Sequence, residues 1–179
     1  MAGLPARKRR EERTVNVWLF KTEPSTFGLD DLRAAPGATT SWDGVRNYQA
    51  RNFLRDRIAL GDRGILYHSS CAVPAAVALL EVVRAGYPET PSLPSAPSRR
   101  PASAPEPERP VWYAVDVHLL LPFPHPVTRP AMREHPDLIH SRLLQRGNRL
   151  SVLPLSAKEA QAILDLADVD PAAIRDATK

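Results

Sequence analysis

The segment 42–52 combines side chains that could recognise a nucleobase: an indole, a carboxylate, an amide, a phenol and two guanidinium groups. A site for an extruded base needs an aromatic surface for the ring, an amide or hydroxyl for its Watson–Crick edge, and arginines for the flanking phosphates. Trp42, Asn47 and the pair Arg46 and Arg51 match these requirements in turn. The pattern therefore indicates a base-binding site.

The same residues are compatible with a purely structural role. Trp42 and Tyr48 could belong to the core, and Asn47 could cap a helix. The arginines would then be solvated surface residues. Residue types alone leave the binding and the structural interpretations open.

Lys21, Thr22 and Glu23 stand at the end of a predicted strand, where polar side chains can line a cleft. Arginine supplies nearly every other basic group, and lysine occurs elsewhere only at positions 8, 158 and 179. Either a compact ammonium is required at Lys21, or its presence there is chance.

The sequence His68-Ser69-Ser70-Cys71 raises the alternative of a nucleophile with His68 as its base. Neighbouring residues of a strand point to opposite faces, which argues against a contact between His68 and Ser69. We therefore favour a structural histidine, or a histidine that donates to a base. The other histidines lack metal-ligand spacing, so no metal and no cofactor is predicted.

The elements expected around these residues form an α+β domain with a small mixed or antiparallel sheet. Strands are predicted over 15–21, 65–68 and 112–120, short helices over 29–32 and 47–58, and a loop at Trp42. Residues 150–154, which contain Ser151, predict a strand edge. Ser156 and Glu159 predict a capping box before a final helix. Residues 75–83 are ambiguous, and propensity alone favours helix.

The length and the net charge of the chain limit its possible domain organisation and ligands. The chain has 179 residues and a formal net charge of +4, which favours a polyanionic partner such as nucleic acid. We expect a basic flexible tail over 1–14, one domain over 15–168 with a proline-rich loop at 88–110, and a mobile tail over 169–179. A lone cysteine and the lack of an apolar span predict a soluble, cytoplasmic protein without membrane contact.

Several strings of the sequence resemble the EVE domain family, whose fold belongs with PUA-like and YTH domains. They occur in the family's order, at 18–24, 42–54, 67–69, 81–83, 87–88 and 150–154. The resemblance implies a PUA-like, curved β-sheet pseudo-barrel with surrounding helices, and it makes residues 75–83 a strand. The chain departs from the family at Ser70, where asparagine is usual, at Ala75, Ala76 and Ala78, where glycines are usual, and in the loop after Tyr87.

The resemblance also implies a pocket for a chemically modified base, built around the strings 18–24 and 42–52. By analogy with YTH domains, Lys21 and Thr22 line this pocket beside Trp42, on which the base stacks. The predicted base contacts are Trp18, Lys21, Thr22, Trp42, Arg46, Asn47, Tyr48, His68, Ser69 and Ser151. The predicted phosphate contacts are Arg51 and Arg55.

Three functions follow from these observations. The first is a non-enzymatic module that binds a modified base in DNA or RNA. The second is an enzyme on such a base, with Asp43, His68 or Ser69 for proton transfer or attack. The third is a protein-interaction module that uses the proline-rich loop or the basic tail. The sequence leaves the polymer, the modification and the oligomeric state open.

Overall fold

A computed structural model describes residues 14–89 and 111–175. The strands are β1 (Val17–Thr22), β2 (Thr39–Trp42), β3 (Arg63–His68), β4 (Ala75–Pro88), β5 (Tyr113–Thr128) and β6 (Val152–Leu155). The helices are α1 (Leu29–Ala34), the 3-10 turn η1 (Pro36–Ala38), α2 (Tyr48–Asp56), α3 (Arg129–Glu134), α4 (Ala157–Leu166) and α5 (Ala172–Arg175). The predicted basic tail and most of the proline-rich segment lie outside these residues.

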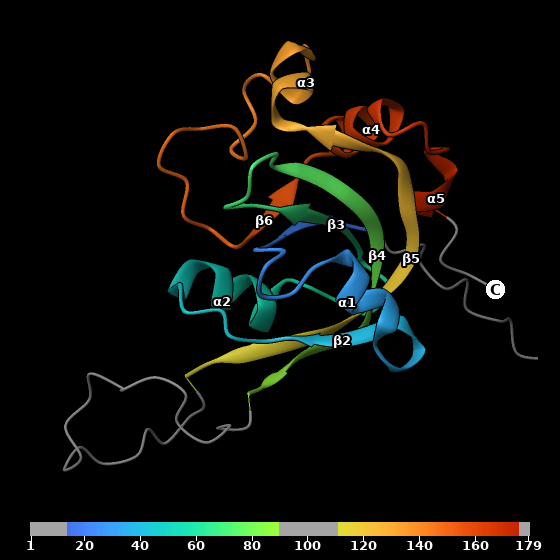
Figure 1. Ribbon diagram of the computed structural model, residues 1–179. Helices are drawn as coiled ribbons and strands as arrows, with labels where there is room; N and C mark the ends of the chain where they lie inside the picture. The colour runs from blue at the N-terminus through green and yellow to red at the C-terminus, as the bar shows by residue number, and fades with distance from the viewer. Residues whose placement is uncertain (1–13, 90–110, 176–179) are drawn as a thin grey trace, which may run out of the picture.

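The strands form one six-stranded mixed sheet in the order β2-β5-β4-β3-β1-β6. Only the neighbours β1 and β3 are parallel, and the other pairs are antiparallel. The long strands β4 and β5 bend together, as Figure 1 shows, and their pairing shifts register at four points. Such irregularities increase local bending and twist. The sheet therefore curls without closing, which confirms the PUA-like fold that the resemblance implies.

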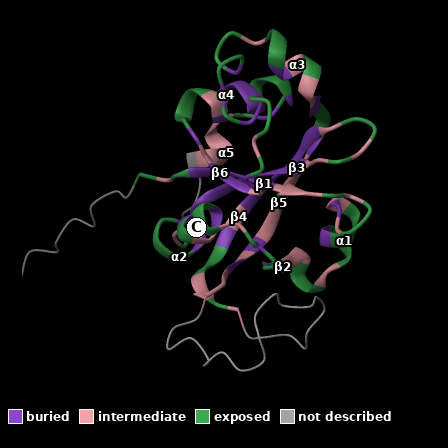
Figure 2. Ribbon diagram, turned by 90° about the vertical axis from the view of Figure 1, so that its left-hand side faces the viewer, coloured by how far each residue is buried: buried purple, intermediate pink, exposed green. Residues whose placement is uncertain are grey.

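The core lies inside this curl. Leu19, Phe20 and Ile65 of the central parallel strands are fully buried. Figure 2 shows the buried residues concentrated in the strands, with much of the helical surface exposed. The ring of Phe20 meets the ring of Trp42 edge-on, with centroids 5.2 Å apart. The curled sheet thus brings its edge strand β2 back onto β1.

Local signals explain the two longer helices. Asn47 caps α2 by accepting hydrogen bonds from the backbone N–H groups of Gln49 and Ala50, and Ala50, Phe53 and Leu54 form its buried stripe. Ser156 and Glu159 form the predicted capping box of α4. Residues 75–83 are strand, as the resemblance implies and against their raw propensity.

Several predicted boundaries are wrong. Strand β5 runs to Thr128 and does not end at residue 120. Trp42 ends strand β2 and does not lie in a loop. Strand β4 continues to Pro88, because Tyr87 and Pro88 still pair with β5. Residues 169–175 belong to the domain, since Val169 is buried, Ile174 packs on the core and the carbonyl of Ala173 accepts a hydrogen bond from Arg63. No helix among residues 14–89 and 111–175 has the length and apolar character to cross a membrane.

Gly86 marks the closest approach between α2 and β4. A Cβ atom at this position would lie 2.2 Å from the carbonyl oxygen of Leu54. We predict that Gly86→Ala lowers the free energy of unfolding by roughly 1–3 kcal/mol, because helix α2 must shift to accept the methyl group. Urea denaturation measures this loss. Ala85→Ser adds an atom at the exposed neighbouring position and should change stability little; an equal loss in both variants would contradict the steric explanation.

Candidate nucleic-acid interface

The parallel pair β1 and β3 divides the predicted polar residues between two faces. Lys21 pairs with Tyr67 and Thr22 pairs with His68 in the register of these strands. Side chains alternate along a strand, so the first pair faces one side of the sheet and the second pair faces the other. Ser69, one residue beyond β3, lies on the side of Lys21 and Tyr67.

A cavity of about 230 Å³ opens on that first side, and we call it the Lys21 cavity. It lies where β1 and β3 end, beneath the segment that joins α3 to β6. Its described lining consists of Lys21, Tyr67, Ser69, Ser70, Pro74, Arg129, Leu143, Gln145, Gly147 and Asn148. The cavity is smaller than a drug-sized pocket of roughly 300–1,000 Å³, and most of its lining side chains can form hydrogen bonds.

The Lys21 cavity is cationic. Burial lowers the pKa of the Lys21 ammonium, and the nearby Arg129 guanidinium lowers it further. No Asp or Glu is among the described residues that line the cavity. Burial also raises the pKa of the Tyr67 phenol, which keeps this group a neutral hydrogen-bond donor. The site therefore suits an anionic or acceptor-rich ligand.

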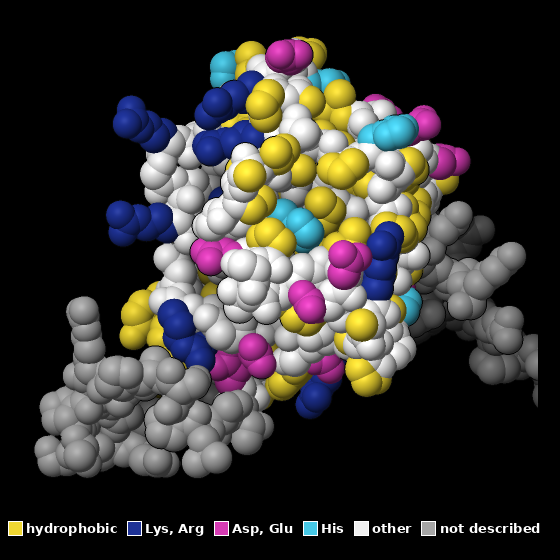
Figure 3. All heavy atoms as spheres, viewed as in Figure 1, with side chains coloured by type: hydrophobic (Ala, Val, Ile, Leu, Met, Phe, Trp, Pro, Cys, Tyr) yellow, Lys and Arg dark blue, Asp and Glu magenta, His cyan; other side chains and the backbone are white. Residues whose placement is uncertain are grey.

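A second hollow of about 290 Å³ adjoins the Lys21 cavity, and we call it the arginine groove. The two share Gln145, Gly147 and Asn148 as lining. The other described lining residues of the groove are Asn47, Gln49, Arg142, Arg146, Arg149 and Leu150. All three arginines are exposed. Figure 3 shows Lys and Arg side chains gathered on the left, over α3 and the segment between α3 and β6.

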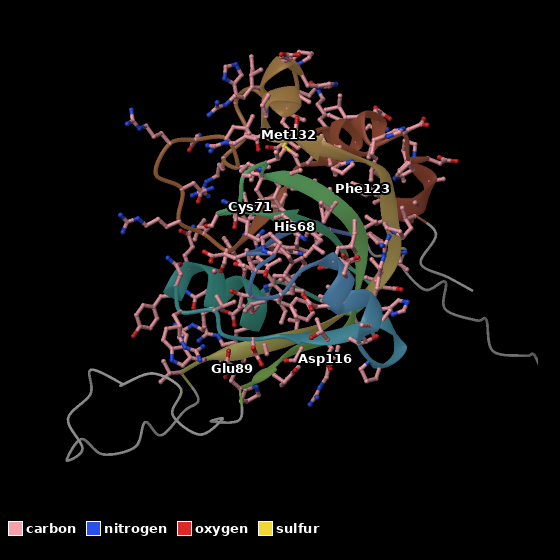
Figure 4. All side chains as sticks on the ribbon, in the orientation of Figure 1. His68, Cys71, Glu89, Asp116, Phe123 and Met132 are labelled. Carbon is pink, nitrogen blue, oxygen red and sulfur yellow. The ribbon has the colours of Figure 1, made fainter. Side chains whose placement is uncertain are left out.

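On the other side of β1 and β3, the predicted residues support the turn before α1. The Thr22 hydroxyl donates to the Phe27 carbonyl at 2.8 Å, and His68 Nε2 accepts from the Leu29 N–H at 3.2 Å. Neither residue lines the Lys21 cavity. Strand alternation turns both side chains toward α1, and their role as base contacts stays a prediction. Figure 4 marks His68 and Cys71 near the end of β3.

The hydrogen bond of His68 requires a neutral ring. Burial lowers the pKa of His68, and the Asp30 carboxylate partly opposes this effect. The Ser69 hydroxyl donates to the Thr22 carbonyl at 3.2 Å. His68 and Ser69 therefore bind different partners and form no base–nucleophile pair. The described residues also contain no cluster of three or more His, Cys, Asp or Glu suited to a metal.

Two predicted aromatic contacts belong to the core. Trp18 is only 1% exposed, and its indole N–H donates to the buried Asp62 carboxylate at 2.9 Å. This correction removes Trp18 from the base-binding set, because a ligand cannot reach a side chain enclosed by the core. Trp42 is 7% exposed and packs on Phe20. The broad aromatic surface expected of Trp42 is consequently covered.

The remaining predicted residues of segment 42–52 lie at the surface around the start of α2. Asn47 lines the arginine groove. Its side-chain oxygen Oδ1 already accepts the hydrogen bonds of the helix cap, so its side chain can offer a ligand only the amide N–H groups. Tyr48 is 63% exposed and stacks on Trp112 with centroids 5.3 Å apart. The guanidinium groups of Arg46 and Arg51 flank this pair, each 5.1 Å from the ring it covers.

These surface arginines are partly occupied. Arg46 forms an ion pair with Glu89 at 2.9 Å, and Arg51 donates to the Val111 carbonyl at 2.7 Å. Arg55 pairs with its neighbour Asp56 at 2.6 Å. Since neither Arg51 nor Arg55 lines either hollow, their role as phosphate contacts stays a prediction.

Ser151 is held next to the Lys21 cavity, because its carbonyl accepts the backbone N–H of Lys21 at 2.7 Å. The residues that the sequence analysis missed come mainly from the segment before it. Three arginines, a glutamine, a glycine and an asparagine fall within residues 142–149. This dense polar run was the available signal. No sequence signal pointed to Arg129, because only the fold brings this residue close to Lys21.

The neutral His68 gives a pH-dependent prediction. The pKa of His68 is lower in the folded state than in the unfolded chain. Neutral His68 therefore contributes its full stabilisation above its ordinary pKa of about 6.5. This contribution is lost as the pH falls through the pKa of the folded state. We predict that His68→Gln, whose side-chain oxygen can accept the Leu29 N–H, reduces this loss. Urea denaturation at a series of pH values between about 8 and 5, the range in which histidine titrates, measures this loss of stability. The exposed His140→Gln is the control; an unchanged pH dependence in His68→Gln would contradict the assignment.

Ser70 is strained, with a φ angle of 52°. A side chain beyond glycine costs roughly 1–2 kcal/mol in this left-handed region, and asparagine tolerates it better than serine. We predict that Ser70→Gly raises the free energy of unfolding by about 1 kcal/mol, and that Ser70→Asn gives a smaller gain. Ala72 has no positive φ, so Ala72→Gly should instead lose stability. A loss in both glycine variants would refute strain at Ser70.

Comparison with known proteins identifies relatives of the chain. Thymocyte nuclear protein 1 of Mus musculus is 35% identical over 173 residues, covering 87% of this chain and 75% of that protein. A hypothetical protein from Leishmania major superposes with a TM-score of 0.75 at 34% identity, covering 87% of this chain and 96% of the other. Human THYN1 protein, solved in complex with DNA containing 5-methylcytosine, has a TM-score of 0.75 at 32% identity and coverages of 87% and 99%.

The name of the mouse relative refers to the nucleus, and the cytoplasmic location expected for this chain stays a prediction. The family model of the EVE domain matches residues 16–166, which include every strand of the sheet. The chain belongs to the EVE domain family.

Proposed function

We propose that this protein is a non-enzymatic module that binds nucleic acid and receives a modified base in the Lys21 cavity. The observation that carries the proposal is the junction of two hollows: a polar cavity next to a groove with three exposed arginines. A base in the cavity would leave its own phosphates close to the arginine groove. The human relative solved with DNA containing 5-methylcytosine supports this class of ligand.

Each part of the site has a distinct task in this proposal. Arg142, Arg146 and Arg149 neutralise phosphates, which gives affinity that depends on salt and little on sequence. Ser69, Asn148 and Lys21 offer hydrogen bonds to the edge of the base. Ser151 keeps the backbone of Lys21 in place.

The surface around α2 extends the proposed contact. The exposed Tyr48 stacks on the half-buried Trp112, next to Asn47, which lines the arginine groove. Aromatic side chains stack on bases of any sequence. We assign Tyr48, with Arg46 and Arg51 beside it, to a nucleotide that flanks the bound base. Trp42 supports the site from the core through its contact with Phe20.

The salt dependence of binding tests the role of the arginine groove. We predict that the variant with Arg142, Arg146 and Arg149 changed to Gln binds modified and unmodified strands more weakly by the same factor. The slope of log affinity against log salt should fall by about 0.9 for each lost contact with duplex DNA and by about 0.7 for single strands. Fluorescence anisotropy with matched DNA and RNA oligonucleotides measures both quantities.

Arg33→Gln is the matched control, because this exposed arginine of α1 lines neither hollow. It should leave the affinity and the slope within error of the parent protein. The proposal fails if the triple variant keeps the full salt slope, or if no oligonucleotide binds the parent protein at low salt.

A further inference from the structure

Two cations in the Lys21 cavity form no ion pair within the described part of the chain, as is also true of the arginines of the arginine groove. Arg33, Arg46, Arg55, Arg63 and Arg84 each form an ion pair with an Asp or Glu. Among the residues that the structure describes, neither Lys21 nor Arg129 forms one. Both line the same cavity. The cavity thus brings two cations together without a carboxylate among its described lining residues.

Arg129 has a polar atom without a partner among the described residues. Its Nε atom is buried without a hydrogen-bond partner, and its guanidinium reaches the Leu144 carbonyl only at 3.5 Å. A buried donor is nearly always paired in a folded protein, and an exception calls for an explanation. Because Arg129 lines the cavity, an acceptor that enters it would give this guanidinium hydrogen bonds that the protein does not supply.

Lys21 and Arg129 also repel each other. The repulsion and the burial of Lys21 both lower the pKa of its ammonium. An anion bound beside them would favour the charged lysine and raise this pKa again. The rest of the lining suits an oxygen ligand, since Ser69, Ser70 and Asn148 add neutral donors around the two cations.

The same lining does not suit a methyl group. Recognition of a methylated base through apolar contact needs exposed aromatic or aliphatic surface in the pocket. The apolar side chains among the described lining residues are Tyr67, Leu143 and Pro74. Tyr67 is only 3% and Leu143 only 4% exposed, and Pro74 is half-buried. The rings of Trp18 and Trp42 are buried in the core. A methyl group on a base would therefore gain little in this cavity.

We infer that the Lys21 cavity is an oxyanion site, and that the modified base it prefers carries a carboxylate instead of a methyl group. This inference rests on the proposed function, because it names the substituent of the base that the proposed cavity would receive. A phosphate group also presents negatively charged oxygen atoms that accept hydrogen bonds from Lys21 and Arg129. It is therefore the second possible source of the oxyanion.

Three matched oligonucleotides separate these ligands. They differ at one position, which holds cytosine, 5-methylcytosine or 5-carboxylcytosine. We expect the full chain to bind the carboxylated strand at least about tenfold more tightly than the methylated one, because charge-assisted hydrogen bonds are roughly twice as strong as neutral ones. Fluorescence anisotropy at fixed salt measures this ratio.

Variants at the two cations test the mechanism. In Lys21→Met and Arg129→Met, the strand with 5-carboxylcytosine should bind no more tightly than the strand with cytosine, because the preference for carboxylate depends on these two cations. Lys158→Met is the charge-matched control, because this exposed lysine lies outside both hollows. Thermal melting checks that each variant is folded, and Lys21→Gln and Arg129→Gln replace a variant that is not.

Free ligands separate this inference from the proposed function. Thermal-shift titrations with 5-carboxylcytidine and with inorganic phosphate report binding to the cavity without any oligonucleotide. Stabilisation by 5-carboxylcytidine that disappears in Lys21→Met supports a base-borne carboxylate. Stabilisation by phosphate alone, with the same dependence on Lys21, supports the oxyanion site and overturns its assignment to the base. If neither ligand depends on Lys21 or Arg129, the inference is overturned even where oligonucleotides bind.

Discussion

The register between β1 and β3 is the constraint on which the site depends. A slip of one residue in either strand would turn its entire set of side chains to the opposite face. In the observed register, Lys21 and Tyr67 face the cavity while Thr22 and His68 face α1. Which side chains line the cavity is thus set by the pairing of β1 with β3, which begins at Val17 and Arg63, at the opposite end of the two strands.

Asp62 fixes that pairing where the strands begin. Its buried carboxylate accepts hydrogen bonds from the backbone N–H groups of Asn16 and Ala59 and from the indole of Trp18. Next to it, the backbone N–H of Arg63 donates to the Asn16 carbonyl at 2.9 Å. Trp18 accordingly serves the site from a distance. It secures the register that turns Lys21 toward the ligand.

Alternation, caps and apolar stripes are local signals, and they predicted β1, β3, the first part of β5 and the helices α2 and α4. The family resemblance, and not these signals, indicated β4 and the pocket roles of Lys21 and Ser69. The sequence did not predict the partners of Lys21. Arg129 and Asn148 reach the cavity only because β5 extends to Thr128 and the following segment folds back over β1. Density of polar residues was misleading for segment 42–52: Asn47 caps a helix and Trp42 is covered by the core, while Tyr48 stays at the surface.

Arg63 and Arg129 show how differently this fold treats two guanidinium groups. Arg63 is fully buried, and it pairs with Glu81 and donates to the carbonyls of Gly61 and Ala173. That arrangement ties β3 to β4 and to α5, so its charge is satisfied by the structure it holds together. Arg129 shares a cavity with a like charge and keeps a buried donor unpaired. Unsatisfied polar groups of this kind oppose folding and persist where a ligand makes use of them. The contrast within one chain is the physical reason to regard the Lys21 cavity as a binding site and Arg63 as part of the frame.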